Sequence, residues 1–570
     1  MSPRAVVVGA GLAGLAAGLH LAAAGWQVDV LEREPVTGGL LGMLVHDTGS
    51  GPLPLEFGPQ SFGLPEVVRA CFEAAGLSMD DHVTLTPLDP PLQARFADAS
   101  VLTVHRDRAA MLAELADFCG PADRDGMARF LDDVTASTRS TLADLHPALD
   151  ALLDQAGDGD SARRSGTLTR LGRTTQDLRR QLRAIGSVAG YVHDPRLRRL
   201  YDWTVVPGLS TPGTSALSCY ADLVAGAWRP VGGMHRLAEG LAEAVRAVGG
   251  TIQTGVTVTG LVRRGRRVVA VRAEQRGPAG EVRSGQAQPP DALEIDCDAL
   301  VLATDPVTAR TLLDPEPGTT TAIRRWPTPP SCWLLVAAGQ FEAPDQTATR
   351  TVSFGREGSP GRAGSFGLAE ALRPNRSLGA EEVQIGRLPT DPTLLVELLR
   401  PSPLEWTQSQ ARPGANGEAA AGQAQHAAPT ASGVIASVLT ATPHLGYYSQ
   451  MRRNNDAGRL VTTSQDWGRI AGHYRDHILT VLQARGFTGF GSAAVEQVFT
   501  PVDWLARGQR HGSPFAGPIA ATARRQLLLR GQRPGNVEVA DGGPYDLVAG
   551  ALIRGMVAAE RIRSWPTPDQ

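Results

Sequence analysis

Cysteine is scarce in this 570-residue chain. No two cysteines have the Cys-X-X-Cys spacing of zinc or iron–sulfur sites. A disulfide framework is also unexpected, because such frameworks staple small secreted domains that are dense in cysteine. The pattern fits a reducing compartment, and we expect a cytoplasmic protein. The five cysteines are Cys71, Cys119, Cys219, Cys297 and Cys332.

Excess charge and long apolar runs are missing too. The chain has 55 basic and 58 acidic residues, and the net charge of −3 gives no whole-chain argument for nucleic-acid binding. No apolar run reaches the roughly 18 residues that a membrane-spanning helix needs. No signal peptide is expected before the first strand, which begins near residue 5. The length exceeds what one hydrophobic core supports, so two or more structural units are expected.

The N-terminal stretch indicates a βαβ dinucleotide-binding unit. A short apolar strand runs into a Gly-X-Gly-X-X-Gly turn, an Ala/Leu-rich helix follows, and a second apolar strand comes next. Gly9 allows the tight turn, Gly11 lets a pyrophosphate approach the backbone, and Gly14 lets helix and strand pack closely. The helix N-terminus presents free N–H groups to the phosphates. Glu32 ends the second strand, where an acid that holds a ribose hydroxyl is expected.

Further glycines occur in two later segments. Gly38 and Gly39 follow the second strand and would let the backbone approach a cofactor again, with an ordinary turn as the less favoured alternative. Near the C-terminus, a strand at 536–540 ends in Asp541 and two more glycines. The helix expected at 547–563 then has an N-terminus able to face a polarised cofactor edge.

A basic amphipathic segment spans 171–185, and more arginines follow at 194–200. Two interpretations stay open for these residues. They form a solvated helix face, or they form a surface that docks on anionic lipid headgroups. The arginines of the first segment are Arg173, Arg179, Arg180 and Arg183.

A histidine pair, His473 and His477, has the four-residue spacing of metal ligands on a helix. No third ligand stands nearby in the sequence, so no metal site is expected, and an exposed helix face is the simpler interpretation.

Taken together, these segments resemble the FAD-dependent amine-oxidase-like superfamily, and within it the carotenoid desaturases of the phytoene-desaturase type. The N-terminal glycine motifs are common to the superfamily. More specific are the Gly58-Pro59 turn, the helix at 65–76 and the segments His-Asp-Pro-Arg-Leu-Arg-Arg-Leu at 193–200, 228–250 and 512–536. The resemblance covers nearly the whole chain except two Gly-, Ala-, Gln- and Pro-rich segments at 274–290 and 401–432, which we expect to be flexible insertions.

The resemblance implies FAD as the cofactor and assigns most of its contacts. Glu32 would bind the adenosine ribose, the backbone of Val258 would pair with adenine, and Asp541 would bind the ribityl or phosphate region. The family usually has an arginine after the second glycine pair, and here Leu40 stands there instead. The implied cofactor-binding residues are Gly9, Gly11, Leu12, Ala13, Gly14, Glu32, Gly38, Gly39, Gly58, Pro59, Val258, Asp541, Leu547 and Val548.

The resemblance also implies the fold. We expect a Rossmann-like FAD-binding domain of α/β class, with three ββα layers, assembled from segments 1–75, 226–312 and 495–570. A mixed α+β domain of antiparallel sheet and helices, made of 76–225 and 313–494, would hold the substrate and face the membrane.

The implied activity is desaturation of a carotenoid or its precursor, either phytoene or a later substrate such as a hydroxylated carotenoid undergoing 3,4-desaturation. A polyene has no charged or polar group that the protein could bind or polarise. The flavin would therefore accept the hydride at N5, and the protein would supply an apolar tunnel. A quinone or oxygen would reoxidise the flavin, and peripheral membrane attachment is expected. Glu56, His235 and Asp202 are polar candidates for a catalytic base, and none is preferred.

Two other functions remain possible on the same fold. An amine oxidase would need an aromatic cage near the flavin, and aromatic residues make up only 5% of the chain. A prenyl-protein chaperone would bind lipid without redox chemistry, and the absence of flavin absorbance would identify it.

Overall fold

The computed structural model describes most of the chain, with gaps. It covers residues 2–47, 52–154, 188–204, 221–275, 291–315, 331–344, 348–356, 391–399, 434–442, 464–493, 495–507, 534–540 and 547–565, together with 509, 512 and 514. Most of the predicted insertions, 276–290 and 401–432, and the four arginines of the 171–185 segment lie outside these residues.

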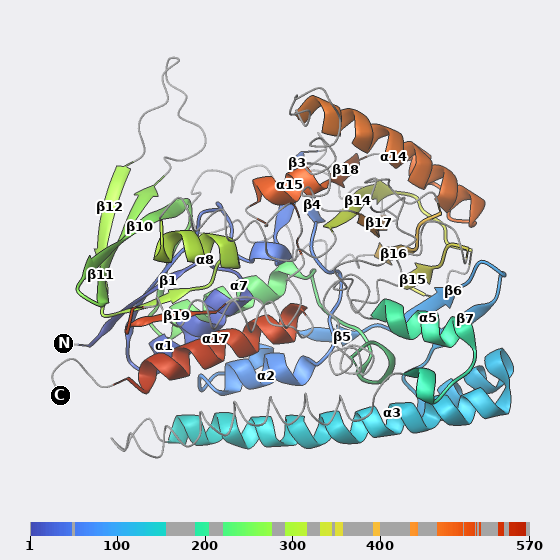
Figure 1. The fold of residues 1–570 in the computed structure, drawn as a ribbon, viewed down its shortest axis with the longest axis horizontal. Coiled ribbons are helices and arrows are strands. Elements are labelled where there is room, and N and C mark those ends of the chain that lie inside the picture. The colour runs from blue at the N-terminus through green and yellow to red at the C-terminus, as the bar shows by residue number, and fades with distance from the viewer. Residues whose placement is uncertain are drawn as a thin grey trace, which may run out of the picture.

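A five-stranded parallel sheet forms the first layer of the nucleotide-binding part (Figure 1). Its middle strand is β1, because Ala5, Val6, Val7 and Val8 are apolar enough to be buried on both faces. Strand β13 lies directly beside β1 and runs parallel to it. The strand order is β19 (Val537–Val539), β13 (Ala299–Leu302), β1 (Arg4–Val8), β2 (Gln27–Leu31) and β9 (Thr251–Gln253).

Two further layers cover this sheet. On one face, Val6, Leu300 and their neighbours pack against an antiparallel sheet of β10 (Val256–Arg264), β11 (Arg267–Gln275) and β12 (Asp291–Asp296). On the other face lie α1 (Leu12–Ala23), α7 (His235–Ala247) and α17 (Leu547–Arg563), with α2 (Pro65–Glu73) against α17. The predicted ββα arrangement of discontinuous segments is therefore confirmed. Glu274 and Gln275, predicted to start an insertion, end β11 instead, because both pair with β12.

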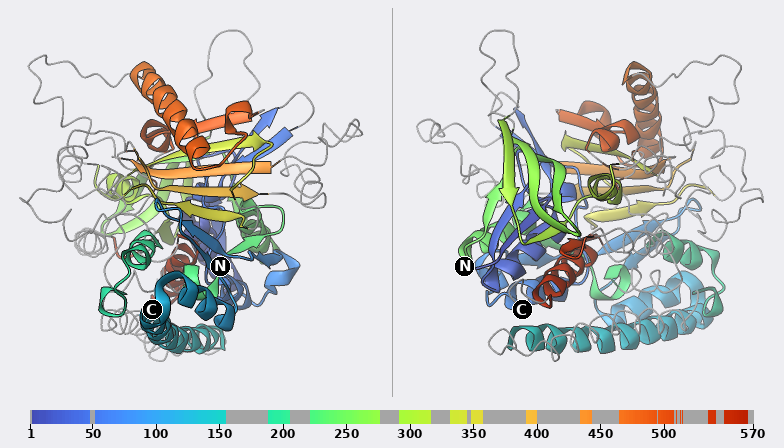
Figure 2. Two further views of the ribbon diagram at one scale, coloured as in Figure 1. Left: turned by 90° about the vertical axis from the view of Figure 1, so that its right-hand side faces the viewer. Right: turned by 60° about the vertical axis from the view of Figure 1, so that its left-hand side comes forward.

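A seven-stranded mixed sheet forms the second part. Its order is β18 (Val495–Phe499), β14 (Ser331–Gly339), β17 (Val434–Thr442), β16 (Leu394–Leu399), β15 (Arg350–Ser353), β6 (Leu92–Arg95) and β7 (Val101–Val104). Helix α14 (Ser464–Ala484) covers one face, as the left view of Figure 2 shows. The boundary expected at residue 495 would assign β18 to the FAD-binding domain, whereas β18 pairs with β14 in this second sheet.

The face of this sheet that is turned away from α14 is called the inner face below. It contains alternate residues of each strand, since successive side chains of a strand point to opposite faces. Several of its members pack with the hairpin of β3 (Met43–Asp47) and β4 (Pro52–Glu56) and with α15 (Pro501–Ala506). On the four strands β14 to β17 its described residues are Cys332, Leu334, Val336, Ala338, Arg350, Val352, Leu395, Glu397, Leu399, Ile435, Ser437 and Leu439.

A long helix, α3 (Arg108–Asp154), runs beneath both parts (Figure 1). It is interrupted at Gly120, whose φ of 79° is not helical. Among the residues that the structure describes, no helix is both long and apolar enough to cross a membrane.

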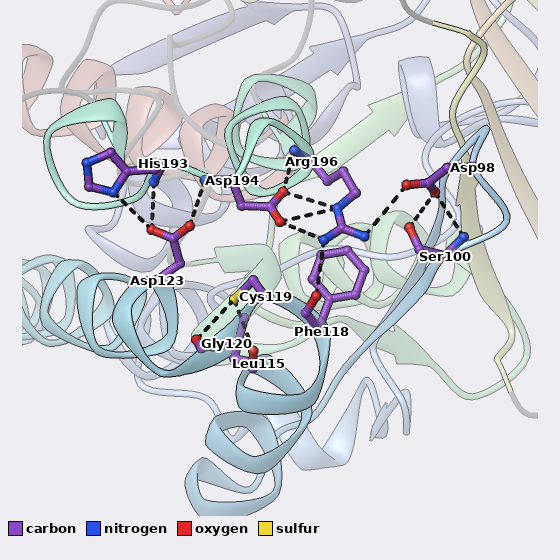
Figure 3. Close-up of polar contacts among 10 residues, drawn as sticks. All are labelled: Asp98, Ser100, Leu115, Phe118, Cys119, Gly120, Asp123, His193, Asp194 and Arg196. Carbon is purple, nitrogen blue, oxygen red and sulfur yellow. Dashed lines mark hydrogen bonds and ion pairs between the residues drawn. The ribbon is translucent and has the colours of Figure 1, made fainter.

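The arginines at 194–200 hold α5 (Pro195–Thr204) in place, and Figure 3 shows the contacts of Arg196. Arg196 forms an ion pair with Asp194 at 2.6 Å and lies over the Phe118 ring. Arg198 donates to the carbonyl of Val192, and Arg199 donates to that of Gly355. These three side chains therefore take part in packing and hydrogen bonding within the protein.

Candidate functional site

The first glycine turn leaves the N-terminus of α1 open. Gly9 has a φ of +103°, which favours glycine, and a Cβ on Gly14 would lie 1.8 Å from the Gly9 carbonyl oxygen. Gly11 is the N-cap, and no side chain caps the helix there. The first N–H groups of α1 are consequently free of side-chain caps, as an anion site at a helix N-terminus requires.

The second glycine pair lies directly against the first turn. The Gly38 N–H donates to the Ala10 carbonyl at 2.9 Å, and both Gly38 and Gly39 have positive φ. A Cβ on Gly39 would lie 3.3 Å from the Cα of Gly11, and one on Gly11 would meet nothing closer than 4.0 Å. Bare backbone from two segments thus faces the same exposed space beside Gly39, so the residues present fit a dinucleotide pyrophosphate.

Glu32 lies beside both turns and is 8% exposed. Its carboxylate accepts the N–H of Ala10 at 2.7 Å and that of Glu34 at 2.9 Å. Burial raises the pKa of Glu32, although the two backbone N–H groups oppose that shift. The Val256 N–H donates to the Glu32 carbonyl, which brings the start of β10 close to this carboxylate. Val258 lies two residues further on, where the pairing of β10 with β11 changes register.

The segment after the glycine pair turns toward the second sheet. A Cβ on Gly58 would lie 1.9 Å from the Leu40 carbonyl oxygen, so only glycine fits there, and Pro59 follows. Leu40 packs with the cluster that includes Ile435 and Leu439 of the inner face. Leu40, which follows Gly39, therefore connects the two glycine turns (residues 9–14 and 38–39, the glycine cradle below) to the apolar surface of the second sheet.

Two candidates for a catalytic base, Glu56 and His235, form one buried cluster. Glu56 accepts from His235 Nδ1 at 2.7 Å and from the His235 backbone N–H at 2.8 Å. Arg229 donates to the second carboxylate oxygen at 2.9 Å and to Gln60. Burial opposes ionisation of Glu56, but Arg229 and His235 outweigh it and hold its pKa below the usual range.

The Glu56 cluster is tightly packed, and it connects segments that are far apart in the sequence. A Cβ on Gly233 would lie 2.7 Å from the Glu56 carboxylate, so the turn before α7 closes directly over it. The participation of Arg229 and Gln60 was missed from the sequence. No local pattern marks Arg229, because it meets Glu56 only when β8 (Trp228–Pro230) reaches the β4 segment. Gln60 donates to the Glu56 carbonyl within the same segment, and its side chain also accepts from Arg229.

The other predicted site residues lie at the following positions. Leu12 and Ala13 form the first turn of α1, and Val548 is 1% exposed at the start of α17. Asp541 lies outside the described residues, and of Leu547 and Asp202 only the backbone is described. His473 is exposed, His477 stacks on Tyr474, and no metal-ligand group of three gathers anywhere in the described part of the chain.

The family follows from a comparison with known proteins. Residues 12–344 match the model of the family described as flavin containing amine oxidoreductase. The chain belongs to this family. It is therefore a flavin-dependent oxidoreductase, and its cofactor is FAD, as the resemblance implied.

Individual relatives agree with this assignment. A phytoene dehydrogenase of Streptomyces griseus is 31% identical over 98% of this chain and 94% of its own length. A hydroxyneurosporene desaturase of Cereibacter sphaeroides is 33% identical over 47% of this chain, and the chain spans about half (52%) of that relative.

Solved structures are similar in fold. An oxidoreductase from Methanosarcina mazei has a TM-score of 0.51 at 13% identity and is matched over 97% of this chain and 99% of its own. A single-site mutant of putrescine oxidase has the same TM-score and identity, with 99% of both chains covered. At such low identity, these likenesses concern the fold alone.

Proposed function

We propose that this protein is an FAD-dependent carotenoid desaturase. The observation that carries the proposal is the inner face of the second sheet, which is largely aliphatic and is joined through Leu40 to the glycine cradle of the cofactor. The near full-length similarity to a phytoene dehydrogenase supports the same substrate class.

The centre of the inner face is suited to an apolar chain. Leu395 and Leu439 are cross-strand partners on the middle strands, and both are partly exposed. Their neighbours on the opposite face, Val396 and Val438, are 1% and 0% exposed. The partly exposed Leu395 and Leu439 therefore face the cofactor side and offer an aliphatic contact to a polyene.

The chain's own residues would act by binding and alignment. FAD, when bound, supplies the hydride acceptor, which an uncharged polyene needs because the protein can polarise it little. The open N–H groups of α1 and the backbone of Gly38 and Gly39 hold the pyrophosphate, and Glu32 holds the ribose. The aliphatic inner face excludes water and fixes which carbon–carbon bond lies against the flavin.

The test is reconstitution with FAD followed by turnover. We expect a flavin absorbance that dithionite bleaches, and a red-shifted polyene spectrum after incubation with phytoene or a hydroxylated carotenoid in liposomes. A colourless protein that cannot be reconstituted would instead favour a lipid-binding chaperone. A flavoprotein that oxidises amines and leaves both carotenoids unchanged would overturn the proposal.

We further propose peripheral attachment to the membrane that holds the substrate, with a quinone or oxygen as electron acceptor. The basic segment at 171–185 is the proposed docking surface. Changing Arg179, Arg180 and Arg183 to Glu should abolish flotation with anionic liposomes, and unchanged flotation would return this segment to a solvated helix face. Reoxidation of the bleached flavin by a quinone under nitrogen, compared with air, distinguishes the two acceptors.

A further inference from the structure

One row of the inner face is polar although its neighbouring rows are aliphatic. Arg350 on β15 is the cross-strand partner of Glu397 on β16, and Glu397 is the partner of Ser437 on β17. On one side the next row contains Val352, Leu395 and Leu439, and on the other side it contains Leu399 and Ile435.

The polar row contains a buried ion pair. Arg350 Nε lies 3.4 Å from Glu397 Oε1, and the two side chains are only 12% and 8% exposed. Ser437, next to Glu397, is 3% exposed. A carboxylate, a guanidinium and a hydroxyl are thus gathered within one aliphatic surface.

Stability does not account for this pair. Removing two charges from water costs several kcal/mol per ion, and an apolar pair of similar volume is often as stable or more stable. A hydrocarbon polyene gains nothing from the row either, because it neither donates nor accepts a hydrogen bond. A hydroxyl group on the substrate would gain from it, since a hydroxyl can donate to a carboxylate and accept from a guanidinium.

We propose that Arg350, Glu397 and Ser437 form a subsite for the hydroxyl group of an oxygenated carotenoid. The inference rests on the proposed function and deepens it, because it selects a hydroxylated substrate over a pure hydrocarbon such as phytoene. In this arrangement the hydroxyl donates to Glu397, and Arg350 and Ser437 donate to its oxygen.

The position of the row also orients the substrate. The row lies two residues, or about 7 Å along the strand, from Leu395 and Leu439 at the open centre of the sheet. Leu439 in turn belongs to the cluster that contains Leu40, next to the glycine pair. A hydroxyl in the subsite therefore places the hydroxylated end of the substrate, rather than its middle, near the cofactor.

The test compares a carotenoid hydrocarbon with its hydroxylated derivative of the same conjugation length. We expect the wild-type enzyme to favour the hydroxylated substrate in kcat/KM by about tenfold or more, the value of a hydrogen bond to a charged group. The Arg350→Leu/Glu397→Leu double variant should equalise the two substrates while it retains turnover of the hydrocarbon.

A matched control is available in the same part of the protein. Arg485 and Asp391 form an ion pair at the end of α14, and the corresponding Arg485→Leu/Asp391→Leu variant should keep the wild-type preference. If the inner-face double variant fails to bind FAD, Glu397→Gln and Ser437→Ala provide the same comparison, with the dissociation constants of both carotenoids read from flavin absorbance.

The possible failures are distinguishable. A wild-type enzyme with equal kcat/KM for both substrates, or a double variant that keeps the preference, would overturn the subsite. Desaturation of neither substrate by reconstituted wild-type enzyme would instead overturn the proposed function.

Discussion

The protonation state of Glu32 is expected to make FAD affinity depend on pH. Burial raises its pKa, so the carboxylate that would accept a ribose hydroxyl becomes protonated at a higher pH than an exposed glutamate. We expect FAD affinity to fall as pH drops through this raised pKa. Titrating FAD into apoprotein at several pH values measures it. Glu32→Gln should bind FAD weakly at every pH, and a wild-type affinity that does not vary with pH would contradict the role.

Substitutions of Gly14 and Gly11 are expected to have different effects: the first on the stability of the apoprotein, the second on FAD binding. Gly14→Ala should lower the melting temperature of the apoprotein, because the new Cβ would collide with the Gly9 carbonyl. Gly11→Ala should leave that temperature unchanged, since its Cβ enters open space, yet weaken FAD binding by occupying the cradle. Gly472→Ala, an exposed helix position with nothing nearby, is the control and should be neutral or stabilising by about 0.5–1 kcal/mol. Equal FAD affinity of Gly11→Ala and wild type would show that the cradle lies elsewhere.

At the residue scale, the sequence predicts what short-range spacing determines. Gly9, Gly11, Gly14 and Glu32 belong to one contiguous βαβ unit, so their places follow from the motif. The polar row of the inner face could not be predicted, because cross-strand pairing of segments with no shared motif brings it together.

The contact between α1 and α2 contains a buried histidine. His20 Nε2 lies 3.0 Å from the Cys71 carbonyl, and burial lowers the pKa of His20 from 6.5 to about 4. The unfolded chain therefore takes up this proton first as pH falls. We expect stability to decrease between pH 6.5 and about 4, by up to about 3 kcal/mol.

The measurement is the melting temperature at several pH values across this interval. His20→Gln keeps a donor for the Cys71 carbonyl and removes the titration, so its pH dependence should be flatter than that of the wild type. His473→Gln, at an exposed position on α14, should leave the wild-type slope unchanged. Parallel curves for His20→Gln and wild type would refute the assignment.

Asp123 ties α5 to α3 (Figure 3). Its carboxylate accepts the backbone N–H groups of His193 and Asp194, each at 2.7 Å. Asp123→Ala leaves both donors without this acceptor and should cost about 1–3 kcal/mol, measured as a fall in melting temperature. Asp125→Ala removes an exposed carboxylate two residues away and should be nearly neutral. Equal falls in melting temperature for the two variants would contradict a stabilising role for the hydrogen bonds to Asp123.

At the element scale, apolar periodicity predicts helices and strands but not their sheet partners. The helix expected at 65–76 begins at the first residue of α2 and extends three residues beyond its end. By contrast, β18 begins the segment that was expected in the FAD-binding domain but pairs with β14 of the second sheet, because its alternating pattern is compatible with either sheet. The arginines of α5 look solvated in the sequence, and only the fold shows the carbonyls and carboxylate that they bond.

Across the whole molecule, the Glu56–Arg229–His235 cluster connects segments more than 170 residues apart. Arg229→Met should cost about 3–5 kcal/mol, because it leaves a buried carboxylate without its main counter-charge. In the wild type the lowered pKa of Glu56 adds stability above its unfolded value of 4.5, and this stability is lost as pH falls.

Without Arg229, burial dominates and the pKa of Glu56 rises, so the variant should recover relative to wild type in acid. Melting temperatures at pH 5 and pH 8 measure this difference. Arg69→Met, which removes an exposed ion pair with Asp80, should lower neither temperature noticeably. A deficit for Arg229→Met that is the same at both pH values would contradict the account.

The strand order of the first sheet has a consequence for synthesis on the ribosome. Strand β1 is translated first, but its neighbour β13 and the edge strand β19 come from the middle and the far end of the chain. About 530 residues separate β1 from β19, and at roughly 10 residues per second the nascent chain waits about a minute for this partner and for α17, which covers α1. During that minute an almost wholly apolar α1 emerges without its cover. Production of this protein should therefore depend on chaperone supply, and a premature stop anywhere before β19 should yield aggregate rather than a smaller folded domain.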